Sequence, residues 1–393
     1  MKITKVSVDV VELGPRSADL LPGSGRTRGR TPRIVPIGSQ HRLRYTHEWS
    51  ETDKPVFEAN ELFLRVQTDE GVEGVCTVFG TRLTPEMVEV LRATVVGLDP
   101  LKREEIYQRL HLGTRWVYQP PGWFGHFDNC LWDIAGKAAG MPVCRLVGQV
   151  RDRFAAYHTG EDGDGTAEHY LHMIEGVREK FGITAYKFHN YEGARANIAL
   201  FRRLRRELGD DYSLINDPVC SYTLREAIEV GKVMEELGFL WLEEPFREQE
   251  MRQYQELCRA LTIPVVATEM LMHDMTICAQ WLLAGATDSI RVSAARSGTT
   301  ALLKMAHFAE LYGANVEING PGGLGGHVHV QLGCAVANTE LYEHFERFAP
   351  LAREYGITNP PVPVEGYLTP SPLPGWGAEI DWDFVGKHTV RSY

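Results

Sequence analysis

The sequence predicts an α/β protein built around a modified (β/α)7β barrel, with an α+β domain in front of it. From about residue 153 to 347, short apolar runs alternate strictly with helical patterns, as in β/α units. The preceding part instead shows three strands followed by helices. The 393 residues leave room for a barrel of roughly 250 residues and a second domain. We therefore expect a domain boundary near residues 145–152.

The barrel prediction depends on eight strands separated by seven helices. The strands are expected at 154–158, 185–189, 212–217, 239–243, 264–269, 289–293, 315–319 and 341–346. The helices are expected at about 167–181, 192–208, 223–237, 247–261, 273–284, 298–312 and 325–337. Strands that alternate with helices of this length are typical of parallel sheets.

The first part of the chain reads as an antiparallel meander with helices behind it. Strands are expected at 3–13, 61–67 and 72–79, and helices at 84–96, 101–111 and 123–139. The stretch 14–56 is too long for an ordinary connection, and its arginines fit either a functional loop or a solvated surface. The tail from residue 348 is rich in proline and glycine.

Composition excludes several classes of partner. A net charge of −11 without a long basic run argues against nucleic acid and anionic membranes. No uninterrupted apolar segment approaches the length of a membrane span, and the start MKITKVSVDVVEL lacks the layout of a signal peptide. The seven scattered cysteines form no CxxC pair, which is typical of a reducing cytoplasm.

Three acidic residues follow apolar runs at equal spacing. Asp217 ends YSLIND, Glu243 lies in FLWLEEP and Glu269 ends PVVATE, each 26 residues from the next. The carboxyl ends of parallel barrel strands open onto one face, so these acids are expected side by side. Neighbouring carboxylates repel one another unless a hard divalent cation lies between them. The spacing therefore predicts a Mg²⁺ site, although any one of these acids alone fits a helix cap or a loop surface.

The motif WLEEP, with an acid 26 residues before and after its first glutamate, resembles the enolase superfamily. Within it the sequence is similar to the mandelate racemase subgroup, which includes many acid-sugar dehydratases. The resemblance implies metal ligands at Asp217, Glu243 and Glu269, with Glu244 beside them as a supporting group. It also implies a capping domain (1–148) whose loop 14–56 covers the substrate, a catalytic barrel (149–347) and a segment (348–393) that returns to the cap.

The second barrel strand carries a candidate base in AYKFHN. Lys187 and His189 are two residues apart and are expected to project to the same side. The family motif here is typically Lys-x-Lys, and its second lysine, often the base, falls on His189. Because histidine titrates near neutral pH, we expect His189 to act as the base and Lys187 to bind the substrate carboxylate. A structural histidine paired with a carboxylate remains the alternative.

On the opposite wall the family's Asp and His pair matches Ser293 and Asn319, so that pair is missing. His327, which follows GPGGLGG, is a further candidate acid or base, and a solvent-facing position at a helix start is the alternative. Four side chains are expected to contact the substrate: His158, Arg296, Asn319 and Arg44.

These residues favour a Mg²⁺-dependent lyase. A bound cation stabilises the negative charge that appears when the proton next to a substrate carboxylate is removed. Because the residues offer a candidate base on one side only, we expect dehydration of an aldonate or aldarate to a 2-keto-3-deoxy acid. A racemase or epimerase, a lactone cycloisomerase and a non-catalytic ligand-binding pseudoenzyme remain open. The resemblance also implies a small carboxylate substrate and a homo-oligomer.

Overall fold

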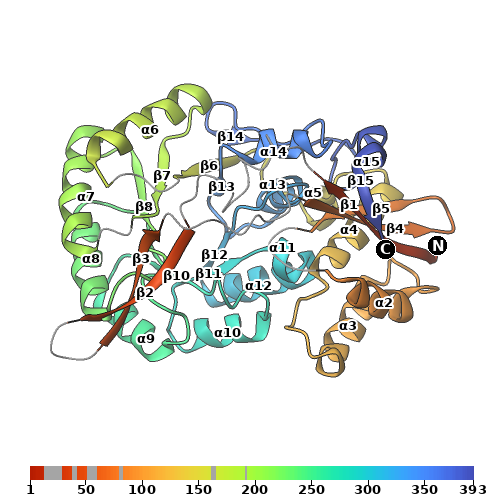
Figure 1. The fold of residues 1–393 in the computed structure, drawn as a ribbon, viewed down its shortest axis with the longest axis horizontal. Helices are drawn as coiled ribbons and strands as arrows, with labels where there is room; N and C mark the ends of the chain where they lie inside the picture. The colour runs from red at the N-terminus through yellow and green to blue at the C-terminus, as the bar shows by residue number, and fades with distance from the viewer. Residues whose placement is uncertain (13–28, 38–41, 51–59, 79–82, 161–164, 191–192) are drawn as a thin grey trace.

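The computed structural model describes residues 1–12, 29–37, 42–50, 60–78, 83–160, 165–190 and 193–393; for 29–37 and 42–50 only the backbone is described. A parallel sheet surrounded by helices occupies one side of the molecule, and a smaller sheet with both chain termini lies on the other (Figure 1). The expected mixed α/β architecture with two parts is therefore present.

The larger sheet forms the barrel, with strand order β12-β11-β10-β9-β8-β7-β6-β13 and parallel pairing throughout this path. Its strands are β6 (Phe154–Thr159), β7 (Ala185–Phe188), β8 (Ser213–Asn216), β9 (Leu242–Glu243), β10 (Val265–Ala267), β11 (Ser289–Val292), β12 (Asn315–Ile318) and β13 (Tyr342–His344). The two ends of this path meet after β12, where a Cβ on Gly320 would lie 2.8 Å from the carbonyl oxygen of Glu343.

One helix or helix pair follows each of the first seven strands. These are α6 (Ala167–Phe181), α7 (Ala194–Leu208), α8 (Leu224–Glu236), α9 (Met251–Ala260), α10 (Met275–Leu283), the short α11 (Ala294–Ser297) with α12 (Thr299–Tyr312), and α13 (Gly325–Ala335). Seven β/α units and an eighth strand confirm the predicted (β/α)7β barrel. Figure 1 shows these helices outside the strands, where they enclose the apolar core between the two layers.

The smaller sheet is antiparallel, with order β15-β1-β4-β5. It contains β1 (Ile3–Glu12), β4 (Asn60–Thr68), β5 (Glu73–Thr77) and β15 (Thr389–Ser392), and it is accompanied by α2 (Pro85–Val95), α3 (Arg103–Val117), α4 (Gly125–Ala139) and α5 (Val143–Val147). The pairing of β15 with β1 returns the end of the chain to the first sheet. The remaining tail holds α14 (Phe348–Glu354), β14 (Tyr367–Leu368) and α15 (Trp382–His388).

Helix α4 attaches the smaller part to the barrel next to β11. The amide of Asn129 donates to the Ala294 carbonyl oxygen at 2.8 Å and accepts from the Thr299 backbone N–H at 2.9 Å. A Cβ on Gly125 would lie 2.5 Å from the Gly298 nitrogen, so only glycine allows this approach. These contacts fix the turn that follows β11.

The predicted elements agree with the structure in type and order, and the differences lie mainly in the predicted loops. Within the stretch 14–56, β2 (Gly29–Ile37) and β3 (Arg42–Ser50) pair as an antiparallel hairpin, while 14–28, 38–41 and 51–56 lie outside the described residues. The helices that the structure describes fall short of the length and hydrophobicity needed to cross a bilayer.

Candidate active site and metal centre

The inside of the barrel is built in two layers by the two-residue period of its strands. The inner apolar layer consists of Tyr157, Ala185, Ile215, Trp241 and Val266. Two residues further along the first four strands stand the polar side chains Thr159, Lys187, Asp217 and Glu243. Alternation along a strand therefore places lysine and carboxylates at the carboxyl end of the barrel, above an apolar floor.

Glu269 reaches this layer by a different route. It follows Val266 by three residues rather than two, and Thr268 between them has a φ of +81°. This conformation is uncommon for a residue other than glycine, and it reverses the side to which the next residue points. Glu269 therefore lies in the same layer as Asp217 and Glu243, although it is three residues rather than two from its apolar-layer residue. Glu244, after β9, also has a positive φ of 39°.

Lys187 links three carboxylates. Its Nζ lies 2.6 Å from Glu343 Oε1, 3.2 Å from Glu243 Oε1 and 3.5 Å from Asp217 Oδ2, and the side chain is buried. Burial alone would lower the pKa of Lys187, but Glu243 and Glu343 raise it well above its ordinary value. Lys187 therefore carries a positive charge in this arrangement.

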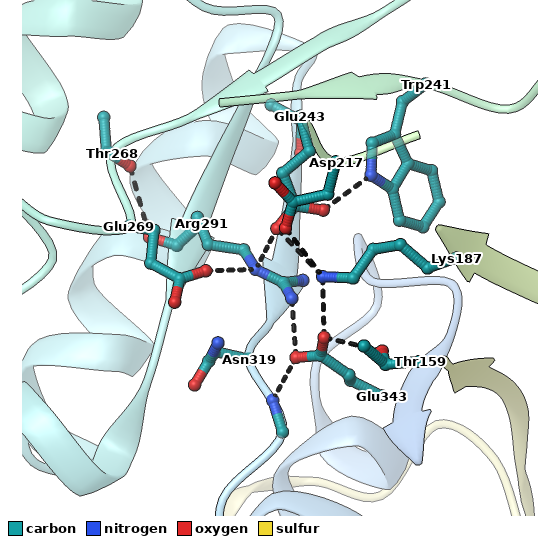
Figure 2. Close-up of polar contacts among 12 residues, drawn as sticks. Thr159, Lys187, Asp217, Trp241, Glu243, Thr268, Glu269, Arg291, Asn319 and Glu343 are labelled. Atoms are coloured by element: carbon teal, nitrogen blue, oxygen red, sulfur yellow. Dashed lines mark hydrogen bonds and ion pairs between the residues drawn. The ribbon is translucent and has the colours of Figure 1, made fainter. Parts of the chain in front are cut away.

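Arg291 of β11 links the other side of the cluster and was not among the predicted site residues. Its Nε lies 3.0 Å from Glu243 Oε1 and 3.4 Å from Glu269 Oε2, and one terminal nitrogen lies 2.6 Å from Glu343 Oε2. Figure 2 shows the side chains of Arg291 and Lys187 among the carboxylates. No acidic spacing signals this residue; only its place in the middle of a predicted strand could have indicated it.

Glu343 of β13 was also missed. It accepts hydrogen bonds from Thr159 at 2.8 Å and from the Gly320 backbone N–H, in addition to its two ion pairs. Burial would raise its pKa, but Arg291 and Lys187 lower it far below the ordinary value, so this carboxylate is ionised. The sequence could have indicated this residue, because Glu343 is an acid inside the predicted strand 341–346 and lies two 26-residue steps after Arg291.

His189 lies at the open side of the cluster. Its Nε2 is 3.1 Å from Asp217 Oδ2, and 21% of its side chain is exposed, against 2% for Lys187. Both side chains therefore reach the same carboxylate oxygen, as their expected common direction requires. Of the two, only His189 is accessible to a molecule that enters from solvent.

Glu244 takes no part in the ion-pair network of the described residues. Burial, followed by the negative charges of Glu269 and Glu248, raises its pKa well above the ordinary value. Its Oε1 is buried without a hydrogen-bond partner among the described residues. A protonated carboxyl group fits this place, next to the candidate ligands but not paired with a cation.

The structure does not bring His158 to the carboxylates. His158 points to the opposite face of β6 from Tyr157 and Thr159, and its Nδ1 lies 3.2 Å from Nδ1 of His344. The ring also packs near Tyr186, while Phe181 of α6 contacts His344. The expected substrate contact is therefore corrected: strand alternation directs His158 to the helix layer, and Thr159 occupies the inward position.

His327 also lies elsewhere. It is buried in the first turn of α13 and lines a cavity of about 330 Å³ together with Asn359, Thr369 and Ser371 of the C-terminal tail. Burial lowers the pKa of His327 to about 4. This position fits neither the predicted role as an acid or base in the barrel nor the solvent-facing alternative, because the C-terminal tail covers the start of the helix.

Asn319 stands at the end of β12 on the wall beside Glu269 and Arg291 (Figure 2). Its carbonyl oxygen accepts from His329 Nδ1 at 2.6 Å, and the other nitrogen of His329 accepts the Ala294 N–H at 3.0 Å. Both ring nitrogens of His329 are thus used to hold the ends of β11 and β12. Arg296 is partly buried in α11, and the side chain of Arg44 in β3 lies outside the described part of the chain.

The donor set fits a hard divalent cation. Asp217, Glu243 and Glu269 supply carboxylate oxygens only, the ligand type that Mg²⁺ prefers. If all four carboxylates including Glu343 are ionised, their formal charge of four is opposed by the two positive charges of the lysine and the arginine, so one divalent cation would make the cluster neutral. Among the described residues these acids do not already surround one common point, because the two basic side chains lie between them.

The eight-stranded barrel carries acidic residues at the ends of three consecutive strands. This arrangement is that of an α/β-barrel protein with a candidate metal site at the carboxyl ends of its strands. Residues 50–148 match the mandelate racemase/muconate lactonizing enzyme N-terminal domain, and residues 170–384 match the enolase C-terminal domain-like family. The chain therefore belongs to the mandelate racemase/muconate lactonizing enzyme family of the enolase superfamily.

Several known proteins are similar to this chain over most of its length. The chain is 27% identical to a D-mannonate dehydratase from Novosphingobium aromaticivorans over 84% of this chain and 92% of that protein. It is 26% identical to an L-talarate/galactarate dehydratase from Salmonella typhimurium over 77% of each. The crystal structure of a D-glucarate dehydratase from Agrobacterium tumefaciens, complexed with magnesium, covers all of both chains with a TM-score of 0.80 and 26% identity.

Proposed function

We propose that the protein is a Mg²⁺-dependent hydro-lyase that dehydrates an acid sugar, an aldonate or aldarate, to a 2-keto-3-deoxy acid. The observation that carries the proposal is the one-sided arrangement of His189 beside Asp217, with an amide instead of a base at Asn319. The similar proteins named above are dehydratases of mannonate, talarate, galactarate and glucarate.

Asp217, Glu243 and Glu269 would hold the cation. When bound, Mg²⁺ acts as a Lewis acid that stabilises negative charge on the substrate carboxylate as the adjacent proton is removed. Lys187 is proposed to act as a fixed positive charge next to this place rather than as a direct substrate contact, because its buried ammonium group is held by ion pairs to three carboxylates.

His189 is the proposed base, since it is the accessible basic side chain at the cluster. It takes the proton from the carbon next to the carboxylate, and the electron pair of that C–H bond forms the ene-diolate. The C–O bond at the β-carbon then breaks, and the hydroxyl group leaves as water with the proton that His189 carries. The resulting enol tautomerises to the 2-keto-3-deoxy acid, so atoms and electrons balance without a further reactant.

Racemisation and epimerisation need a second base on the other face. The position of Asn319 provides an amide, and the ring of His329 is occupied by two backbone groups. His327 lines the cavity beneath the C-terminal tail. This distribution favours elimination, which one acid/base residue can complete.

The roles of the remaining parts belong to the same proposal. We infer that residues 1–148 cap the barrel at 149–347, that 348–393 ties the two together, and that the loop 14–56 with Arg44 covers the substrate. Arg296 and Asn319 are proposed to contact it. A cytoplasmic location fits the seven free cysteines, and a homo-oligomer is proposed from the family resemblance.

The test is a screen of aldonates and aldarates with Mg²⁺, read by a 2-keto acid assay and by proton NMR in D₂O. A keto acid formed by the wild type and lost in His189→Ala, with Mg²⁺ binding retained, is the expected result. His172→Ala, an exposed histidine on α6, is the matched control and should keep full activity. Deuterium at the α-carbon without a keto acid would identify an epimerase, and no reaction with any acid would favour the ligand-binding alternative.

A further inference from the structure

Arg291 is a permanent positive charge in the middle of the barrel. It lies within β11, its side chain is fully buried, and its guanidinium group stays protonated at every physiological pH. Burying such a charge is costly unless several hydrogen bonds and ion pairs satisfy it. The groups that satisfy it therefore indicate what the residue does.

The guanidinium contacts residues on three strands and one residue just after a fourth. Nε lies 3.0 Å from Glu243 Oε1 on β9 and 3.4 Å from Glu269 Oε2, just after β10. One terminal nitrogen lies 2.6 Å from Glu343 Oε2 on β13 and 3.0 Å from the Tyr157 hydroxyl on β6. Arg291 thus shares with the proposed cation two of the three carboxylates that would bind it.

Two of the three proposed metal ligands are also held by residues other than Arg291. Glu243 is also held by Trp241 Nε1 at 3.0 Å and by Lys187 at 3.2 Å. Asp217 accepts the Val219 N–H at 3.0 Å and contacts His189. Loss of Arg291 would therefore leave these two carboxylates in place and would chiefly remove a positive charge from beside them.

We propose that Arg291 is a positioning residue that acts through Glu243 and Glu269, and that its fixed charge lowers the affinity of the metal site for Mg²⁺. Like charges a few ångströms apart in a buried site repel strongly, and the arginine also occupies oxygens that the cation would use. The same charge brings the loaded barrel to neutrality, which favours an anionic substrate. The inference rests on the proposed function, since the cation is the one assigned there.

Two substitutions separate charge from shape. Arg291→Gln removes the charge and keeps a polar side chain, whereas Arg291→Lys keeps the charge and loses the planar fork. We expect the Kd for Mg²⁺, measured by calorimetry, and for Mn²⁺, measured by electron paramagnetic resonance, to fall by at least about tenfold in Arg291→Gln. In Arg291→Lys the Kd should stay within about threefold of the wild type.

Kinetics provide a second readout. With saturating Mg²⁺, Arg291→Gln leaves the barrel with one negative charge in excess, which disfavours both the anionic substrate and the ene-diolate. KM should rise and kcat should fall, each by about tenfold. Tighter metal binding together with slower turnover distinguishes this role from a purely structural one, for which metal affinity and turnover would fall together.

A charge-matched pair keeps the test usable if Arg291→Gln does not fold. Glu343→Gln removes one negative charge and should weaken Mg²⁺ binding, while the double variant Arg291→Gln/Glu343→Gln should bind at least about tenfold more tightly than Glu343→Gln. Unchanged or weaker binding on loss of Arg291, in either background, would overturn the inference. If the Kd pattern holds but the wild type dehydrates no acid sugar, the proposed function fails and the effect of Arg291 on the site stands.

Discussion

His189 Nε2 lies 3.1 Å from Asp217 Oδ2, so the proposed base touches a proposed metal ligand. The contact places proton transfer next to the point where a cation would stabilise the resulting charge. It also orients the imidazole, whose two nitrogens differ once one of them is engaged. The proposed base and the proposed metal ligand therefore form one functional unit.

Replacing His189 by glutamine should lower kcat by about 10²–10⁴, the range typical of a lost acid/base residue. Folding and Mg²⁺ binding should be retained, because three carboxylates remain. The measurement is keto-acid formation from the best substrate, beside Mg²⁺ calorimetry. A decrease in Mg²⁺ affinity that accounts for the whole loss of activity would instead assign His189 to ligand positioning.

Removing one carboxylate should remove the stabilisation by Mg²⁺. At a concentration 100 times its Kd, a ligand that binds only the folded state stabilises it by about 2.7 kcal/mol, so Mg²⁺ should raise the melting temperature of the wild type. Asp217→Asn should abolish this shift and the activity together. Asp210→Asn, an exposed acid after α7, is the control and should retain both. An equal shift in both variants would refute the metal assignment.

Acid should destabilise the protein below pH 6.5 through its buried histidines. Burial lowers the pKa of His158 to about 4, so the folded state resists a proton that the unfolded state accepts near pH 6.5. The stabilisation is complete above pH 6.5 and is lost as the pH falls toward 4, by about 3 kcal/mol for this residue. Urea unfolding at several pH values gives the free energy of unfolding as a function of pH. Between pH 6.5 and 4 this free energy should fall less steeply in His158→Asn than in the wild type. An equally steep fall would contradict the lowered pKa of His158.

The ring of His329 should be required for stability. Phenylalanine at this position would leave the Ala294 N–H and the Asn319 carbonyl group buried without partners, at a cost of about 3 kcal/mol. Urea unfolding should detect the loss, and the exposed His307→Phe on α12 should change stability by less than about 0.5 kcal/mol. Equal stability of the two variants would show that water replaces the ring.

The sequence by itself determined the order of the elements and the neighbourhood of the acids. Local hydrophobic patterns and capping signals specify where each strand and helix falls, and the 26-residue spacing places Asp217, Glu243 and Glu269 on adjacent parallel strands. Lys187 and His189 likewise reach one carboxylate because of the two-residue period. These features depend on residues close together in the chain.

Only the tertiary structure decided which distant side chains complete the site. The positive φ of Thr268 directs Glu269 inward, and the approach of Gly320, after β12, to Glu343 of β13 closes the gap in which Glu343 contacts Lys187 and Arg291. The prediction ended the first barrel strand at His158, but β6 extends to Thr159. Because Thr159 points into the barrel, His158 points to the opposite face of the strand. His327 was misplaced because the C-terminal tail covers it. Ion pairs across the barrel depend on strand register and packing, which the sequence of a single strand does not contain.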